Sequence, residues 1–181
     1  MKMLVVVDYQ KDFVDGALGF PGAALLDAGI AAKIRAYLKN GDWIVQTMDT
    51  HGADYLLTRE GKHLPVPHCL AGTDGWETYG ETAQAIGEAE SSPRFLRVNK
   101  ATFGVHPSDM LQILHRTGNE ITEIEFVGLV SNICVISNLC VFQGAYPLAQ
   151  VLVDPTLIAS HDPKAHGAVL EVMQGLQAQL L

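Results

Sequence analysis

Cys134 lies where a thiol can act as a nucleophile. The apolar run at residues 124–130 predicts a buried strand, and Ser131 and Asn132 carry side-chain oxygens of the kind that cap a helix. Cys134 would then fall in the first turn of a helix over residues 133–146, where unpaired N–H groups and the helix dipole favour a thiolate. The same N–H groups can hold an oxyanion at an attacked carbonyl. The alternative is a small hydrophobic residue in the core.

Three other reactive side chains also follow apolar strand-like runs. Asp8 follows residues 3–7, Asp49 follows residues 43–48, and Lys100 comes just after residues 94–98. The carboxyl ends of parallel strands meet at one edge of a sheet, so these residues and Cys134 are predicted to converge there. Each position has an ordinary explanation by itself, such as a turn aspartate or a solvated lysine. The occurrence of all four residues at strand ends favours a functional site.

Asp8, Lys100 and Cys134 together suit nucleophilic catalysis. Cys134 would attack an electrophilic carbon, and Asp8 would take its proton and return it to a leaving amine. Lys100 would hold both partners in register and favour the thiolate electrostatically. A lysine in such a pocket needs the aspartate as its counter-ion, so each residue accounts for the other.

A second group of side chains has the types that bind a divalent metal. Asp49 and His51 alternate along the chain, so both can point to one side of a strand end, and His68 returns from the loop that follows. Two imidazoles and a carboxylate suit zinc, with iron or manganese as alternatives. Glu60 ranks above His63 as a fourth ligand. Without further context, surface polar residues are the alternative interpretation.

Composition restricts the class of protein. The 181 residues are 48% hydrophobic and 18% charged, which is typical of a globular domain with a sizeable core. The net charge is −8 and the basic residues are scattered, which disfavours nucleic acid or an anionic membrane as a partner. The three cysteines form no disulfide framework, and we interpret Cys69 and Cys140 as core residues. No leader-like or membrane-spanning run is present, so we expect a cytoplasmic enzyme acting on a small molecule.

Strands and helices alternate along the chain. This order predicts a single three-layer α/β/α domain over residues 1–181 with a mainly parallel sheet. A long irregular segment at 52–80 is expected to be functional, as such loops usually are. The expected strands are 3–7, 43–48, 94–98, 124–130 and 149–153, and the expected helices are 25–38, 107–116, 133–146 and 163–180.

Five short motifs resemble those of the isochorismatase-like cysteine hydrolases, and within them the sequence is most similar to nicotinamidases. The likeness covers nearly the whole chain and implies that fold. The motifs are Val-Asp-Tyr-Gln-Lys-Asp-Phe at 7–13, Asp-Thr-His at 49–51, Pro-His-Cys at 67–69 with Ala-Gly-Thr-Asp-Gly at 71–75, Lys100 with Thr-Phe-Gly at 102–104, and Gly-Leu-Val-Ser-Asn-Ile-Cys-Val at 128–135.

The resemblance implies roles for individual residues. The family triad falls on Asp8, Lys100 and Cys134, and a metal, often zinc, would help to hold a pyridine ring. A cis peptide is implied at Leu129–Val130, where the N–H groups of Val130 and Cys134 would face an oxyanion. Homo-oligomers are frequent in the family. The ligands implied for the metal are Asp49, His51 and His68, and the implied pocket aromatic is Phe13.

The expected reaction is hydrolysis of nicotinamide to nicotinate and ammonia through a Cys134 thioester, a step of NAD salvage. The chain departs from the family pattern around the ring-binding wall. Thr50 replaces a common aromatic, and Pro65 and Val66 stand where a tryptophan often lies. The alternatives are therefore a relative acting on another amide, a carbamoyl compound or an isochorismate-like ether, and a non-catalytic binding module. A dinucleotide-binding protein is disfavoured because no glycine-rich turn follows the first strand.

Overall fold

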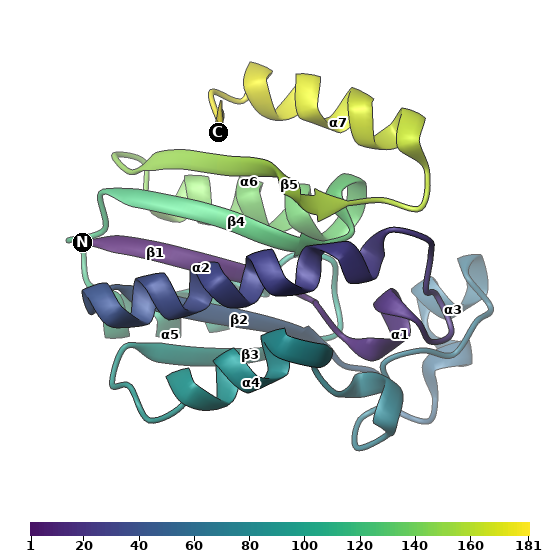
Figure 1. Cartoon of the computed structure of the whole chain (residues 1–181). Coiled ribbons are helices and arrows are strands. Elements are labelled where there is room, and N and C mark those ends of the chain that lie inside the picture. The colour runs from purple at the N-terminus through teal and green to yellow at the C-terminus, as the bar shows by residue number, and fades with distance from the viewer.

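The protein is built on one six-stranded, all-parallel sheet, seen in the computed structural model that describes residues 1–181 (Figure 1). The strands lie in the order β3-β2-β1-β4-β5-β6, so the first strand is central. Their bounds are β1 Lys2–Val7, β2 Trp43–Asp49, β3 Phe95–Lys100, β4 Glu123–Leu129, β5 Gln150–Ala159 and β6 Gln179–Leu180.

Helices cover both faces of the sheet. In Figure 1, α2 and α4 lie in front of the sheet, while α5 and α6 lie behind it. The α-helices are α1 Lys11–Val14, α2 Asp27–Asn40, α3 Arg59–His63, α4 Gly80–Ala89, α5 Pro107–Thr117, α6 Ile136–Ala145 and α7 Pro163–Gly175. Short 3₁₀ turns lie at Ala23–Leu26, Tyr55–Leu57 and Asp74–Trp76, and a π-turn, η4, lies at Ser131–Val135.

The central strand β1 divides its apolar side chains between two cores. Met3, Val5 and Val7 pack into the core shared with α5, α6 and α7. Leu4 and Val6 pack into the core shared with α2 and α4. Successive strand residues point to opposite faces, so a continuous apolar run is what a strand covered on both sides requires.

The strand order reverses between β1 and β4. Ligands of open α/β sheets bind outside the carboxyl ends of the strands at such a reversal. Here Asp8 follows β1, and the η4 turn that carries Cys134 follows β4. The predicted three-layer α/β/α fold is confirmed, with a wholly parallel sheet.

Some elements differ from their prediction. Helix α4 was not expected, and the last helix ends at Gly175, after which Gln179 and Leu180 pair with β5 as a sixth strand. The 52–80 segment contains α3 and two 3₁₀ turns. Cys140 is exposed, contrary to the expected core position, because apolar residues are spread around α6 and do not mark its outward face. None of the helices combines the length and apolarity that spanning a bilayer requires.

Candidate active site

Asp8 is held at the end of β1 by contacts from β2, its neighbour in the sheet, and from β3, the strand beyond it. Its backbone has φ +45°, a left-handed conformation that turns the chain immediately after the strand. Thr47 donates its hydroxyl to Asp8 Oδ1 at 2.6 Å, and Lys100 Nζ donates to Oδ2 at 2.6 Å. The carboxylate is fully buried, and this burial raises the pKa of Asp8 against the lowering effects of Lys100 and Thr47.

Lys100 is the last residue of β3, paired in register with Asp49 of β2. Its side chain is 0% exposed, as is that of Asp8. Burial alone would lower the pKa of Lys100, but the charges of Asp8, Cys134 and Asp49 outweigh it and raise that pKa. Lys100 is therefore an ammonium ion that compensates a buried carboxylate.

Cys134 lies in the π-turn η4 and is 5% exposed. The peptide bond Leu129–Val130 just before this turn is cis, as the resemblance implied. The expected acidic thiol is wrong. Burial raises the pKa of Cys134 well above its ordinary value, and the nearby charges of Asp8 and Asp49 add to the rise, while Lys100 only partly opposes it. The structure therefore places a protonated thiol against the Asp8 carboxylate.

The two residues expected to cap the nucleophile helix do not do so. The turn begins after Val130 with no side-chain cap. Ser131 instead forms a hydrogen bond of 3.0 Å between its Oγ and Nδ1 of His166 on α7, while Oδ1 of Asn132 is buried without a partner. The nucleophile turn is thus anchored to α7 rather than capped.

Asn138 is a buried residue that the sequence did not single out. Its Nδ2 donates to the carbonyl of Cys134 at 2.8 Å and to that of Phe103 at 3.2 Å, and its Oδ1 accepts from Val105 N at 3.0 Å. One amide thus joins the nucleophile turn to the loop after Lys100. No local sequence pattern predicts this role, because Asn138 and Val105 are more than thirty residues apart in the chain.

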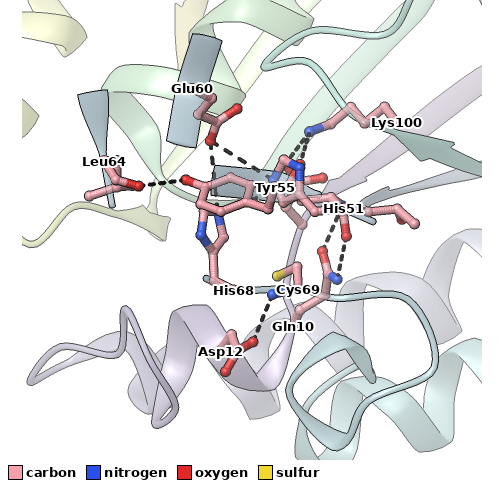
Figure 2. A network of polar contacts seen from close by, with 12 residues as sticks. Gln10, Asp12, His51, Tyr55, Glu60, Leu64, His68, Cys69 and Lys100 are labelled. Carbon is pink, nitrogen blue, oxygen red and sulfur yellow. Dashed lines mark hydrogen bonds and ion pairs between the residues drawn. The ribbon is translucent and has the colours of Figure 1, made fainter. Parts of the chain in front are cut away.

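The predicted metal donors form one cluster. One ligand atom from each of Asp49, His51, Glu60 and His68 lies within 4.8 Å of the others. Asp49 Oδ2 is 3.0 Å from His51 Nε2 and 3.3 Å from His68 Nε2, and Glu60 Oε1 is 3.9 and 3.7 Å from the same two nitrogens. Tetrahedral ligands about 2.1 Å from a zinc ion lie roughly 3.4 Å apart, so this donor set fits such an ion. Figure 2 shows Glu60 facing both imidazoles.

Backbone contacts bring His68 beside His51. His51 N donates to the carbonyl of Cys69, and Ala71 N donates to the carbonyl of His51, so the returning loop forms a short parallel bridge. Asp12 Oδ2 accepts from Cys69 N at 2.7 Å and fixes the turn, where Cys69 has φ +45°. The returning loop therefore places His68 beside His51, as the sequence predicted for a third donor.

The imidazole of His68 is oriented for coordination through Nε2. Its Nδ1 is 2.8 Å from the carbonyl of Val66, which places the ring proton there and leaves Nε2 facing Asp49. Burial opposes ionisation of Asp49, but the adjacent imidazoles of His51 and His68 and the charge of Lys100 hold the pKa of Asp49 below its usual range.

Glu60 reaches the cluster because α3 is pinned to the turn before it. Thr58 Oγ1 accepts from Gly61 N at 3.0 Å and donates to the carbonyl of Tyr55 at 2.7 Å. A Cβ on Gly61 would lie 2.1 Å from that carbonyl, so only glycine permits the approach. Burial and the nearby Asp49 charge raise the pKa of Glu60.

Aromatic rings enclose the two histidines. The Tyr55 ring lies 4.6 Å from His51 and 5.0 Å from His68, and its hydroxyl donates to the carbonyl of Leu64 at 2.9 Å (Figure 2). Phe13 meets His68 edge-on at 5.4 Å. No motif in the sequence points to a role for Tyr55.

Gln10 is a second buried residue that the sequence analysis left without a role. Its Nε2 donates to the carbonyl of Asp49 at 2.8 Å, and its Oε1 accepts from Asp49 N at 2.7 Å (Figure 2). Gln10 thereby ties the backbone of the metal-facing aspartate to the residues that follow β1. Gln10 is part of the motif at residues 7–13. Its contact with the Asp49 backbone depends on the pairing of β1 with β2, which the motif does not show.

A cavity of about 660 Å³ joins the thiol to the metal donors. Cys134, Asp49, Glu60 and His68 all line it, while Asp8 and Lys100 lie behind its wall. The other lining residues are Phe13, Leu18, Gly19, Arg59, His63, Leu64, Phe103, Val130, Ile133 and His161. A small molecule in this cavity would touch the sulfur and the donor cluster together.

Comparison with known proteins extends the likeness to the whole fold. The isochorismatase domain profile matches residues 2–181. The chain belongs to the isochorismatase family. A protein of Bacillus subtilis described as an uncharacterized isochorismatase family protein, PncA, is 27% identical over 174 residues, which cover 93% of this chain and 92% of that protein. The protein is accordingly a hydrolase of this family.

Two solved structures share the family fold over the full chain. The nicotinamidase/pyrazinamidase PncA from Bacillus subtilis superposes with a TM-score of 0.88 at 26% identity, covering 99% of each chain. The pyrazinamidase/nicotinamidase from Streptococcus mutans superposes with a TM-score of 0.87 at 27% identity, covering 100% of each chain. This hydrolase thus keeps the family architecture at low sequence identity.

Proposed function

We propose that this hydrolase cleaves a linear carboxamide with Cys134 as nucleophile. The observation that carries the proposal is the single cavity in which Cys134 faces the metal-type donors, with the buried Asp8–Lys100 pair behind it. In this arrangement the thiol is the nucleophile and the buried carboxylate is its base. The ammonium ion holds the base in place.

In the first half-reaction, Cys134 Sγ bonds to the carboxamide carbon while Asp8 takes the thiol proton. The raised pKa of Asp8 makes it a better proton acceptor than a solvated aspartate. The carbonyl oxygen becomes an oxyanion, for which Val130 and Cys134 offer backbone N–H groups. The Val130 N–H has no backbone partner in the structure, which leaves it free for this role. The C–N bond then breaks, and Asp8 returns the proton to nitrogen so that ammonia leaves.

The second half-reaction releases an acid. Asp8 takes a proton from water as its oxygen bonds to the thioester carbon, and the C–S bond breaks as Asp8 reprotonates the sulfur. Lys100 keeps Asp8 in place through both proton transfers because it remains an ammonium ion. A zinc-type ion held by Asp49, His51, Glu60 and His68 would orient the substrate by accepting a lone pair from its ring or chain.

Nicotinamide is the proposed substrate, with nicotinate and ammonia as products. The Bacillus subtilis and Streptococcus mutans structures that share this fold carry the nicotinamidase name. In this chain Phe13, which lines the cavity and meets His68 edge-on, supplies an apolar wall for a flat ring. The position at 50 that often holds an aromatic is Thr50, which instead accepts a hydrogen bond from Trp76 Nε1 at 2.9 Å.

The test is ammonia release from nicotinamide, pyrazinamide, benzamide and a carbamoyl amino acid by zinc-loaded protein. The Cys134→Ala variant should lose turnover while its melting temperature stays within a few degrees of the wild type. If only the carbamoyl amino acid is hydrolysed, the substrate is a carbamoyl compound and not nicotinamide. Full activity of Cys134→Ala would refute the mechanism.

A further inference from the structure

Arg59 is the only arginine of this chain whose side chain has no protein partner. Each of the other four makes an ion pair or a hydrogen bond: Arg35 with Glu88, Arg97 with Glu90, Arg94 with the carbonyl of Gly41, and Arg116 with the carbonyl of Pro93. A guanidinium carries five N–H donors in a rigid fork that matches carboxylate and phosphate oxygens. Arg59 therefore has its full donor capacity available.

Two imidazoles line the same cavity as Arg59. His63 lies one turn further along α3, and its Nδ1 is 2.7 Å from the backbone carbonyl of Arg59, so its Nε2 remains free. His161 precedes α7 and packs edge-on against Phe20, with 6.3 Å between the ring centroids. Neither histidine has a carboxylate within ion-pair distance, so both imidazoles line the cavity without an acidic partner.

The acids of the cavity do not neutralise this part. Asp49 and Glu60 both face His51 and His68, while Arg59 lies within 4.0 Å of no carboxylate although it directly precedes Glu60 in the chain. Arg59 is exposed and lies at the rim of this cavity, and the whole protein carries a net charge of −8, so an unpaired cation at this place runs against the overall charge balance. Locally it favours an anionic ligand group.

The cavity is also larger than a single-ring carboxamide needs. Its volume of about 660 Å³ equals that of roughly twenty water molecules at about 30 Å³ each. An amide placed at Cys134 leaves room for a second substituent, and the residues on α3 that line this space are Arg59 and His63 beside Glu60.

From these observations we infer that, beside nicotinamide, the site takes carboxamides that carry a second, anionic group of the carboxylate or phosphate kind, and that it prefers such amides to their neutral analogues of the same shape. Arg59 binds this group through its two-pronged fork, and His161, whose ring nitrogens bond to no protein group, donates a further hydrogen bond. The inference rests on the proposed function, because it takes the amide to lie at Cys134. It makes Arg59 a residue that determines specificity rather than one that performs the chemistry.

A matched set of amides tests the inference with zinc-loaded protein. 3-Carbamoylbenzoate and isophthalamide have nearly the same shape but differ in charge, and 3-carbamoylphenyl phosphate tests the phosphate alternative. Arg59→Gln should lower kcat/KM for the anionic amide by about tenfold or more, since a hydrogen-bonded charge is lost, and leave isophthalamide within about twofold. Lys62→Gln is the control, because Lys62 is exposed on the same helix and does not line the cavity.

A binding measurement keeps this inference separate from the proposed function. Isophthalate has no amide to cleave, so calorimetry with it reports the anion subsite even if no amide is hydrolysed. It should bind the wild type and Lys62→Gln equally, and Arg59→Gln about tenfold more weakly. Equal binding by Arg59→Gln, or an equal loss of activity on neutral and anionic amides, would overturn the inference.

Discussion

Lys100 Nζ lies 2.6 Å from Asp8 Oδ2, and neither side chain reaches solvent. The pair joins the ends of β1 and β3, two strands that are not neighbours in the sheet. Thr47, on the strand between them, binds the other oxygen of Asp8. The carboxylate is thereby fixed from two sides, next to the Cys134 thiol whose pKa it raises.

The first prediction concerns the stability that this ion pair confers. Asp8→Asn should lower the free energy of unfolding by as much as about 3 to 5 kcal/mol, because it removes the nearer carboxylate partner of the buried Lys100 ammonium and leaves only Asp49 Oδ1, at 3.9 Å. The double variant Asp8→Asn, Lys100→Met should recover most of that loss but no amidase activity. Urea denaturation with an ammonia assay measures both effects. A double variant less stable than Asp8→Asn would contradict the account.

The second prediction concerns the Cys134 thiol. Its pKa is raised, so the reactive thiolate is scarce near neutral pH, and alkylation should become faster as the pH rises past about 8.5, the ordinary thiol value. Asp8 contributes to the rise, so Asp8→Asn should lower the pKa and speed alkylation at neutral pH. Peptide mass spectrometry after iodoacetamide treatment resolves each cysteine.

Cys140 is the internal control for this measurement because it is exposed, whereas Cys69 is buried. Near neutral pH, Cys140 should be alkylated before Cys134, and Cys69 should be protected as long as the protein remains folded. Alkylation of Cys134 that is already complete in mildly acid solution would show an acidic thiol. That result would restore the expectation drawn from the helix N-terminus.

The third prediction concerns the metal donors. Zinc should raise the melting temperature, since a ligand present at a hundred times its dissociation constant stabilises the folded state by about 2.7 kcal/mol. Glu60→Gln should weaken zinc binding by about tenfold or more, because a coordinating carboxylate is replaced by an amide. Calorimetric titration of chelator-treated protein measures this affinity without reference to activity.

Asp54→Asn is the matched control for the metal experiment. Asp54 is an exposed carboxylate close to Glu60 in the chain but outside the four-residue cluster. It should bind zinc as the wild type does. If Glu60→Gln and Asp54→Asn bind equally well, Glu60 is not a ligand and the site reduces to Asp49, His51 and His68.

The sequence predicted the sheet because its strands are short apolar runs buried on both faces. It missed α4, whose residues Gly80–Ala89 follow a glycine-rich segment without a side-chain cap, and β6, which is two residues long. The residues that α4 buries, Thr82, Ala85, Ile86 and Ala89, do recur at helical spacing, but all except Ile86 are small, so the apolar signal is weak, and β6 is too short to show a period. The convergence of Asp8, Lys100 and Cys134 was predictable from topology, since parallel strands end at one edge.

The supporting contacts were not predictable, because they depend on register and on packing between distant segments. Thr47 meets Asp8 only because β1 and β2 pair Val7 with Thr47. The thiol pKa was misjudged because the helix N-terminus is a local feature, whereas burial and two nearby carboxylates come from the tertiary fold.

The fourth prediction concerns Gly128, which allows β4 to pass close to β1. Gly128 has φ +113°, and a Cβ there would lie 2.0 Å from the carbonyl oxygen of Val7. The pairing of β4 with β5 changes register at the same point, just before the turn that carries Cys134. Gly128→Ala should therefore lower the free energy of unfolding by about 3 kcal/mol or more and reduce kcat.

Gly87→Ala is the matched control, since Gly87 lies within α4, and a Cβ there meets no atom within 4 Å. Alanine in a helix interior should stabilise the protein by about 0.5 to 1 kcal/mol and leave kcat unchanged. Thermal denaturation of both variants separates a general effect of an added methyl group from the steric demand at Gly128. If Gly128→Ala is as stable and as active as the wild type, β4 can move away from Val7. The alignment of Asp8 with the Cys134 turn would then not depend on that close approach.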